Sequence, residues 1–519
     1  MGAFTLRWRS WRRPRPATGQ RGAHVAHTRT ADAGKGLVET RTIDMVPDAE
    51  RHGRPFSQFT LWFGSNTQIT AIVDGALAVT VFKSGALWAI IALFIGNVLG
   101  GIIMALHSAQ GPRLGLPQMI SSRAQFGVYG AIVPLVLVIC MYIGFASTGT
   151  VLSGQAVNGL LHIDIPWVGI VVFGAMTVVV ALLGYRYIHI LGRISSVTGL
   201  LGFIYLTICV FAQLDVGTLL GAGTFSFPVF LSVVGLGAGW QLTYGPYVAD
   251  YSRYLPRETP SAATFGWTFA GSVIGSQWSM ILGVLIGASA MTAAGSEFLD
   301  NQVGFMGVLA GGGVLAMLIF IVILMSKLTV NTLNAYGAFM CALTISTSFT
   351  HNTRVRKRTR AAFVVVIVAA TVVVALFASA DFLANFKNFV LALLMVFTPW
   401  SVINLADYYL ISKDRFDIPG LYDPRGRYGK WNAAALVSYA VGVLVQIPFL
   451  DQTIYTGPFV KLLGGADVSW IIGIIVTAAL YIPWAMRRPV APAATIYPEA
   501  TVVPEIEALA EEDAEVAGH

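Results

Sequence analysis

The chain has 519 residues, of which 55% are hydrophobic and only 11% are charged, and its mean hydropathy is +0.70. A soluble domain carries about 25% charged residues, so this composition excludes an ordinary soluble protein and predicts a chain that lives in a bilayer. The net charge of +7 would suit a nucleic-acid partner, but much of it lies in short loops between apolar runs, which is a topology signal, and we expect no nucleic acid. The three cysteines lie inside apolar runs and imply no disulfide framework: Cys140, Cys209 and Cys341.

The two ends of the chain differ in composition from the part between them. Residues 1–55 are basic and lack the apolar stretch of a signal peptide, whereas residues 489–519 are acidic. We predict that both are disordered cytoplasmic tails that are simply solvated, or, for the basic tail, attracted to anionic lipid heads. Residues 56–488 then form one transmembrane domain without an inserted soluble domain.

Twelve apolar runs follow one another along this domain, each near the 20 residues or more that a membrane helix needs. They lie near 59–82, 86–107, 128–161, 165–184, 191–213, 225–251, 263–291, 310–349, 361–379, 382–411, 432–450 and 467–486. Lys and Arg are concentrated in the loops after the even-numbered runs, including the cluster RVRKR. The positive-inside rule therefore predicts a multi-pass protein of the cytoplasmic membrane with both termini in the cytoplasm.

The first and sixth runs contain polar residues and helix breakers, which hydrocarbon disfavours. The first, LWFGSNTQITAIVDGALAVTVF, has Asn66, Thr67, Gln68, Thr70 and Asp74 between two glycines. The sixth continues into GAGWQLTYGPYVADYSRYLPRET, where glycines and a proline loosen or break the helix. Interrupted segments at matching positions of two halves indicate a midplane binding site, because a break frees backbone N–H and C=O groups for a ligand or an ion.

The eighth run, ILMSKLTVNTLNAYGAF, offers three kinds of polar side chain. Asn331 and Asn334 share a helical face, where their amides could bind the edge of a heterocycle or hold two helices together. Ser326 and Thr329 could offer hydroxyl oxygens to Na+, or bond back to the preceding turn. Lys327 either reaches an interface or lies at the cation site, alone or paired with Asp74, which would favour proton coupling.

Charged residues end the sixth and tenth runs on the cytoplasmic side. Asp250 and Arg253 are three residues apart, and Asp407 ends the stretch SVINLADYYL. We interpret them either as a cytoplasmic gate made of ion pairs or as ordinary helix-end charges at the interface.

Three stretches resemble the nucleobase:cation symporter-1 family, and within it the purine-cytosine permease branch. They are GPRLGLPQMISSRAQFGVYGA, PYVADYSRYLPRET and ETRTIDMVPDAERHGRPFSQFTLWFGSNTQ, and the likeness runs from about residue 38 to 486. The resemblance implies an all-α polytopic fold of twelve transmembrane helices. Two inverted repeats of five helices, LeuT-like, would occupy about 59–213 and 225–411, with spans one and six broken and two extra helices at 432–486.

The same resemblance implies a function and a site. Members import a neutral nucleobase or related ring by alternating access coupled to Na+ or H+, with no catalysis and no cofactor. The ring stacks on aromatics of spans three and six, which implies Phe145 and Trp240, with Tyr244 as the alternate. Amides bind its edge, and the candidates are Gln241, Asn331, Asn334 and, beside the span-one break, Asn66 and Gln68. The cation is implied near Thr329 and Ser326, while Gly149 stands where some relatives carry an amide.

The leading hypothesis is therefore a monomeric importer of a cytosine- or purine-type base. Allantoin, a hydantoin, thiamine or a pyridoxine-like ring remains an alternative cargo. A membrane enzyme is disfavoured because the sequence has no HExxH zinc motif, no phosphate-binding glycine loop and only scattered histidines. A channel is disfavoured because paired broken helices with an enclosed polar site indicate alternating access.

Overall fold

The computed structural model describes residues 43–183, 185–292, 296–350, 357–487 and 491–498. The chain divides into two units, Met1–Glu39 and Thr40–His519, and everything described here belongs to the second. Most of the two predicted tails lies outside the described residues, so their disorder stays a prediction.

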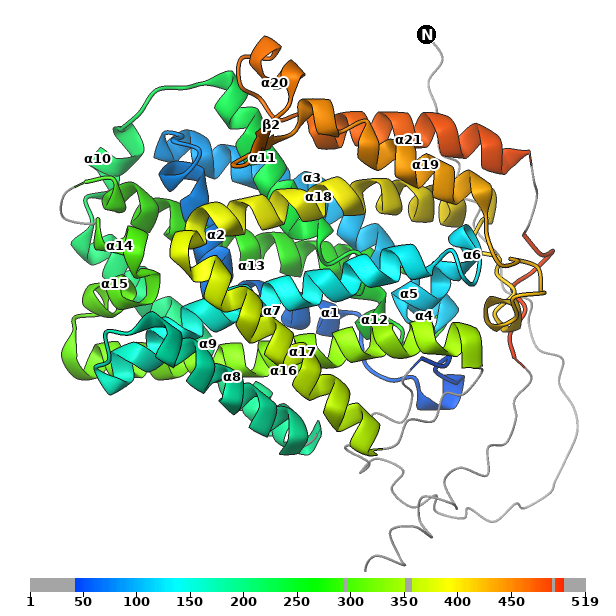
Figure 1. Ribbon diagram of the computed structural model, residues 1–519, viewed down its shortest axis with the longest axis horizontal. Coiled ribbons are helices and arrows are strands. Elements are labelled where there is room, and N and C mark those ends of the chain that lie inside the picture. Colours follow the sequence, from blue (N-terminus) through cyan, green and yellow to red (C-terminus); the bar gives the residue numbers. More distant parts are fainter. Residues whose placement is uncertain (1–42, 184, 293–295, 351–356, 488–490, 499–519) are drawn as a thin grey trace, which may run out of the picture. The chain divides into compact units, whose positions relative to one another are not determined.

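Long helices make up most of the second unit (Figure 1). Each predicted apolar run contains at least one of them. They are α1 (Phe56–Asn66), α2 (Ile69–Thr80), α3 (Ala86–Ser108), α7 (Ile132–Leu161), α8 (Pro166–Leu183), α9 (Tyr185–Gln213), α11 (Phe227–Leu242), α12 (Val248–Ser252), α13 (Ser261–Ala290), α16 (Gly313–Thr350), α17 (Lys357–Ala378), α18 (Phe382–Ala406), α19 (Ala433–Leu444) and α21 (Ser469–Met486).

Among the described residues, eight helical stretches are long and apolar enough to cross a membrane, and one of these, Arg358–Ile411, holds both α17 and α18. Three further helical stretches are apolar but shorter: Ile69–Thr80, Phe227–Leu242 and Ala433–Phe449. The predicted all-α polytopic character is confirmed, whereas the number of twelve crossings stays a prediction.

Short elements that the apolar runs did not predict connect the long helices. The helical ones are α4 (Gly111–Leu114), α5 (Gln118–Ser121), α6 (Arg123–Phe126), α10 (Val216–Gly221), α14 (Glu297–Asp300), α15 (Gln302–Leu309), α20 (Pro458–Leu462), the 3-10 turns η1 (Asp48–Glu50), η2 (Ser379–Asp381), η4 (Pro419–Tyr422) and η5 (Ile447–Phe449), and the π-helical turn η3 (Asp407–Ile411). One small antiparallel hairpin, β1 (Asp451–Gln452) with β2 (Tyr455–Thr456), precedes α20.

The predicted interruptions of the first and sixth spans are both present. Helix α1 ends at Asn66, and Gln68 adopts an extended conformation with φ −148° and ψ 158° before α2 begins. Helix α11 ends at Leu242, and residues 243–247 form turns before α12 begins at Val248. Pro246 has no N–H to offer a continuing helix, which explains why the chain leaves the helical path there. The first break leads into α2, whose residues are all buried, and the second follows the buried C-terminal part of α11.

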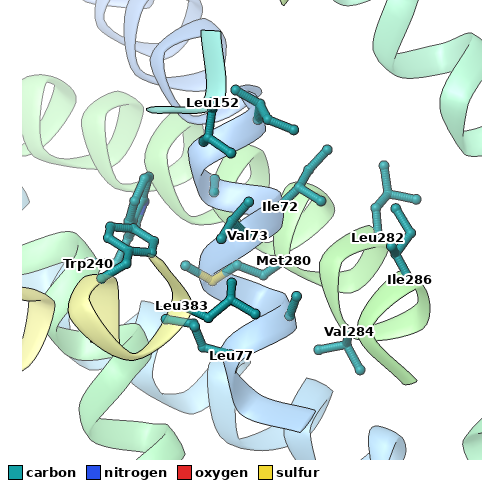
Figure 2. Packing of buried hydrophobic residues seen from close by; sticks show 14 of the residues in the cluster. Ile72, Val73, Leu77, Leu152, Trp240, Met280, Leu282, Val284, Ile286 and Leu383 are labelled. Atoms are coloured by element: carbon teal, nitrogen blue, oxygen red, sulfur yellow. The ribbon is translucent and has the colours of Figure 1, made fainter. Parts of the chain in front are cut away.

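Close packing of α2 against α13 holds the first break in place. A Cβ atom on Gly283 would lie only 1.8 Å from the carbonyl oxygen of Ile72, and one on Gly75 only 2.3 Å from that of Met280. Glycine at both positions therefore lets the two helix backbones approach, as small residues do in membrane bundles. Figure 2 shows the apolar side chains around this contact: Ile72, Val73, Leu77, Met280, Leu282, Val284 and Ile286, with Trp240 and Leu383 nearby.

Candidate functional site

A cavity of about 90 Å³ lies between the two helix breaks. One water needs about 10–15 Å³ of such space, so the cavity has room for a molecule several times larger than water. Its walls come from the α1–α2 break, from α7, from the α11–α12 break and from α16. The lining residues are Trp62, Ser65, Gln68, Thr70, Met141, Tyr142, Phe145, Trp240, Tyr244, Tyr247, Tyr251, Lys327, Val330, Leu333 and Asn334.

Aromatic rings dominate this wall. Phe145 of α7 meets Trp240 of α11 edge to face, with ring centroids 6.0 Å apart and planes at 90°. Trp62 of α1 contacts Tyr244 in the second break, with centroids 5.3 Å apart. The three predicted stacking residues therefore line one cavity. Four more aromatic residues line the cavity and were not predicted from the sequence: Trp62, Tyr142, Tyr247 and Tyr251. The helical spacing of Tyr247 and Tyr251 after Tyr244 could have indicated the last two.

Asn66 joins the two helix breaks instead of lining the cavity. Its side chain is fully buried, and its Oδ1 accepts hydrogen bonds from Trp240 Nε1 at 2.7 Å and from the Tyr244 hydroxyl at 3.2 Å. Its Nδ2 donates to the carbonyl oxygen of Trp62 at 2.7 Å and to Ser272 Oγ at 3.0 Å. Asn66 was predicted to touch the substrate, but the structure gives it the role of orienting the aromatic side chains that do line the cavity.

Gln241 points away from the cavity. Its Nε2 donates to Asn97 Oδ1 at 3.1 Å and to Ser276 Oγ at 2.7 Å, and its Oε1 accepts from Ser272 Oγ at 2.6 Å. Successive residues of an α-helix are about 100° apart, and here Trp240 is turned toward the cavity while Gln241 is turned toward α3 and α13. The predicted pairing of these two neighbours on the cargo is corrected to Trp240 on the cavity and Gln241 in a polar contact between α3, α11 and α13.

Lys327 places an amino group at the edge of the cavity beside the first break. The side chain is 2% exposed, and its Nζ donates to Gln68 Oε1 at 2.6 Å and to the hydroxyl of Thr70. Gln68 in turn donates through Nε2 to the carbonyl oxygen of Ser65 at 2.7 Å. Lys327 therefore bonds to two residues at the first break, and its place at a cation site, one of the two interpretations, stays a prediction.

Asp74 lies one helical turn beyond Thr70 on α2 and is fully buried. Neither of its carboxyl oxygens has a hydrogen-bond partner among the described residues. Because the amino group of Lys327 is bound to Gln68 and Thr70, the predicted pair between Lys327 and Asp74 is not formed in this conformation.

The two asparagines of α16 have different surroundings. Asn331 donates to the carbonyl oxygen of Ala146 and to Thr150 Oγ1, both at 2.9 Å, so it links α16 to α7 and does not line the cavity. Asn334 lines the cavity, and its Nδ2 has no hydrogen-bond partner within the described ranges. A Cβ atom on Gly149 would lie 2.5 Å from Asn331 Oδ1, so this position leaves no room for an amide.

The two hydroxyl residues predicted near a cation face different neighbours. Ser326 lines a second cavity of about 40 Å³ together with Thr67 and Gln68. Thr329 donates to the carbonyl oxygen of Met325 at 3.1 Å, and its hydroxyl lies 3.3 Å from Ser195 Oγ on α9. A cation site shared by these two hydroxyls therefore stays a prediction.

The predicted gate residues divide into two places. Asp250 Oδ1 accepts from the backbone N–H of Gln118 at 2.7 Å, and Arg253 donates to the carbonyl oxygens of Asp250 and Asp44. These two residues thus connect α12 to the start of α5 and to the segment before η1. Asp407 lies elsewhere and accepts from Ser412 Oγ at 2.7 Å and from the Tyr481 hydroxyl at 2.9 Å, which ties η3 to α21.

Arg123 is a buried charge that sequence reasoning counted only as a loop cation. It is 1% exposed and donates to the carbonyl oxygen of Thr344 at 2.8 Å and to Ser348 Oγ at 3.0 Å, both in the last turns of α16. Burial lowers the pKa of Arg123 to about 10, which leaves it charged at neutral pH. A cation at a helix C-terminus is favoured by the helix dipole, so Arg123 anchors the end of α16.

Two broken helices around an enclosed aromatic cavity, in an all-α polytopic fold, define a secondary transporter and not an enzyme. The family described as "Permease for cytosine/purines, uracil, thiamine, allantoin" matches residues 45–473, and the chain belongs to it. A putative purine-cytosine permease of Bacillus subtilis, YxlA, is 36% identical over 86% of this chain and 95% of its own length. The purine-cytosine permease fcyB of Emericella nidulans is 25% identical over 86% of this chain and 88% of its own length.

A solved structure confirms the predicted fold class. It is described as Mhp1, a nucleobase-cation-symport-1 family transporter, in a closed conformation with bromovinylhydantoin bound. The TM-score is 0.66 at 20% identity, with 88% of this chain and 98% of that chain covered. The chain therefore has the LeuT-like fold that the resemblance implied.

Proposed function

We propose that the chain imports a cytosine- or purine-type nucleobase across the cytoplasmic membrane by cation-coupled alternating access. The observation that carries the proposal is the aromatic cavity between the two breaks, with Phe145 and Trp240 from two different helices on its wall. A base that stacks on an aromatic side chain gains about 1–3 kcal/mol, which suits capture and release better than permanent binding. Both termini lie in the cytoplasm, and a monomer suffices, since one chain supplies the whole cavity.

The same cavity suits the alternative ring compounds less well. Allantoin and hydantoins offer smaller or less planar stacking surfaces, while the indole and phenol donors of Trp240 and Tyr244 already bond to Asn66. The wall therefore offers these side chains to a ligand chiefly as ring faces, which favours a flat aromatic base. Competition among ring compounds separates these cargoes.

We further propose that the coupling ion is a proton. The amino group of Lys327 already binds the side-chain oxygens of Gln68 and Thr70, and the Thr329 hydroxyl is bonded within its own helix, so side-chain oxygens for Na+ are scarce. Asp74 is a buried carboxyl group without a hydrogen-bond partner in the described part of the chain, and intramembrane carboxyl groups are frequent proton carriers. Asp250 and Arg253 act in this scheme as part of the cytoplasmic gate.

Uptake by intact cells tests the proposal. Cells that lack other nucleobase permeases are given the chain and radiolabelled hypoxanthine or cytosine, with Trp240→Ala as the matched variant. Saturable uptake that Trp240→Ala abolishes is expected, and it should persist when choline replaces Na+. Asp74→Asn should remove the dependence on external pH. Absence of saturable uptake for every base would overturn the proposed cargo, and strict dependence on Na+ would overturn the proposed ion.

A further inference from the structure

Lys327 supplies a basic group to a cavity whose wall is otherwise mostly aromatic. Among the described residues, Lys327 is the only Asp, Glu, Lys or Arg that lines the cavity. The cavity therefore holds one basic group and no carboxylate. A buried ammonium without a counter-charge is unfavourable, so the group gains most from a ligand that brings electronegative oxygen to it.

The hydrogen-bonding capacity of the ammonium is only partly used. An ammonium group has three N–H donors and no acceptor, and Lys327 donates to Gln68 Oε1 and to the Thr70 hydroxyl. One donor remains for a ligand in the cavity that the lysine lines. Because Gln68 and Thr70 fix the position of the amino group, little side-chain freedom is lost when a ligand accepts this third bond.

The other free polar groups of the cavity do not choose between donor and acceptor edges. The amide of Asn334 carries both a carbonyl oxygen and an NH2 group, and its Nδ2 has no partner. Tyrosine hydroxyls, such as those of Tyr142 and Tyr247, can likewise donate or accept. Lys327 is thus the lining group that can donate but not accept.

We propose that Lys327 makes the site selective for 6-oxopurines over adenine and excludes cationic rings; this inference rests on the proposed nucleobase transport. The O6/N7 edge of a 6-oxopurine presents two acceptors, whereas the same edge of adenine presents one acceptor and one amino donor. In nucleic-acid recognition lysine bonds to the first edge, and a good bidentate pair is worth about 1–3 kcal/mol of discrimination, so the single donor left on Lys327 should give the lower end of that range. Thiamine carries a fixed positive charge, which Lys327 would repel.

Binding competition on the purified full-length chain tests this selectivity. Radiolabelled hypoxanthine is displaced by unlabelled hypoxanthine, adenine or thiamine in detergent. Wild type should bind hypoxanthine at least about tenfold more tightly than adenine, and thiamine should not compete. Lys327→Met keeps the length of the side chain but removes the donor, so the hypoxanthine-to-adenine ratio should fall to near one.

Asn334→Leu is the control, since its amide can both donate and accept, and in nucleic-acid recognition such an amide pairs with the adenine edge. It should not lower the hypoxanthine-to-adenine ratio, in contrast to Lys327→Met. Equal binding of adenine and hypoxanthine by wild type, effective competition by thiamine, or an unchanged ratio in Lys327→Met would each overturn the selectivity while leaving nucleobase transport standing. Failure of every base to bind wild type would overturn the proposed function itself. If Lys327→Met does not fold, the wild-type ratio and the thiamine result still decide.

Discussion

Asn66 is the position at which a single substitution should disturb both helix breaks. Its Oδ1 accepts hydrogen bonds from Trp240 Nε1 and from the Tyr244 hydroxyl, and both of these side chains are buried. Asn66→Leu is similar in size but accepts no hydrogen bond. A buried donor left without a partner costs about 1–3 kcal/mol, so the two orphaned donors together should cost about 2–6 kcal/mol of the free energy of unfolding.

A second substitution isolates the contribution of one of these bonds. Tyr244→Phe in the wild-type background removes a hydrogen bond and should cost about 0.5–1.5 kcal/mol. In the Asn66→Leu background the same change removes an orphaned donor, so it should be neutral or restore about 1–3 kcal/mol. The two effects should therefore differ by at least about 0.5 kcal/mol, which lies within the coupling of about 0.5–3 kcal/mol that contacting residues show.

The assay is denaturation of the four purified variants in detergent, together with the dissociation constant for a labelled base. We expect Asn66→Leu to weaken base binding at least about tenfold, which corresponds to 1.4 kcal/mol, because Trp240 loses the bond that fixes its ring. Additive effects of the two substitutions on unfolding, or full affinity in Asn66→Leu, would refute the role of Asn66 as the link between the breaks.

Three further predictions concern other parts of the chain. Gln241→Leu should lower stability by about 1–3 kcal/mol through the buried partners it leaves unsatisfied, with base affinity retained once the protein is folded, as judged by thermal unfolding and binding. Gly283→Ala should prevent recovery of folded protein on size-exclusion chromatography, because its Cβ would lie 1.8 Å from a backbone oxygen of α2. Gly199→Ala is the control and should be recovered like wild type, because no described atom lies within 4 Å of the added Cβ. Asp250→Ala should lower the rate of uptake severalfold with little change in binding, whereas Trp240→Ala should abolish binding; equal loss of affinity in both would contradict the division into gate and site.

The sequence predicted the two helix breaks well because their causes are local. Glycine, proline and polar side chains inside apolar runs change the backbone wherever they occur in hydrocarbon, so Gln68 and Pro246 could be located without knowing the fold. The long apolar runs likewise located the long helices, because hydropathy and length determine them. Short elements such as α5 and α15 carry no such signal and appeared only in the structure.

Side-chain direction was harder to predict, because it depends on helix rotation and on partners far away in the sequence. Gln241 was assigned to the cargo through its neighbour Trp240, yet it faces Asn97 and Ser276. Asn331 was grouped with Asn334, yet only Asn334 lines the cavity. A residue pair three apart shares a helical face only approximately, and a partner helix decides which member reaches the ligand.

The buried polar partners were also beyond sequence reasoning. Asp74 was considered as a partner of Lys327. The amino group instead bonds to two neutral side chains that precede Asp74 in the chain, Gln68 and Thr70. A choice between such close alternatives depends on distances of a few ångströms, which composition and spacing do not provide.

Accumulation of a base in proteoliposomes requires cargo recognition and ion coupling in the same molecule. The purified chain is reconstituted, an inward proton gradient is imposed without Na+, and labelled hypoxanthine is followed over time, with Trp240→Ala vesicles in parallel. We expect transient accumulation above the external concentration that collapses when a protonophore is added and is absent from Trp240→Ala. Uptake that never exceeds equilibrium, or none for any base, would contradict it.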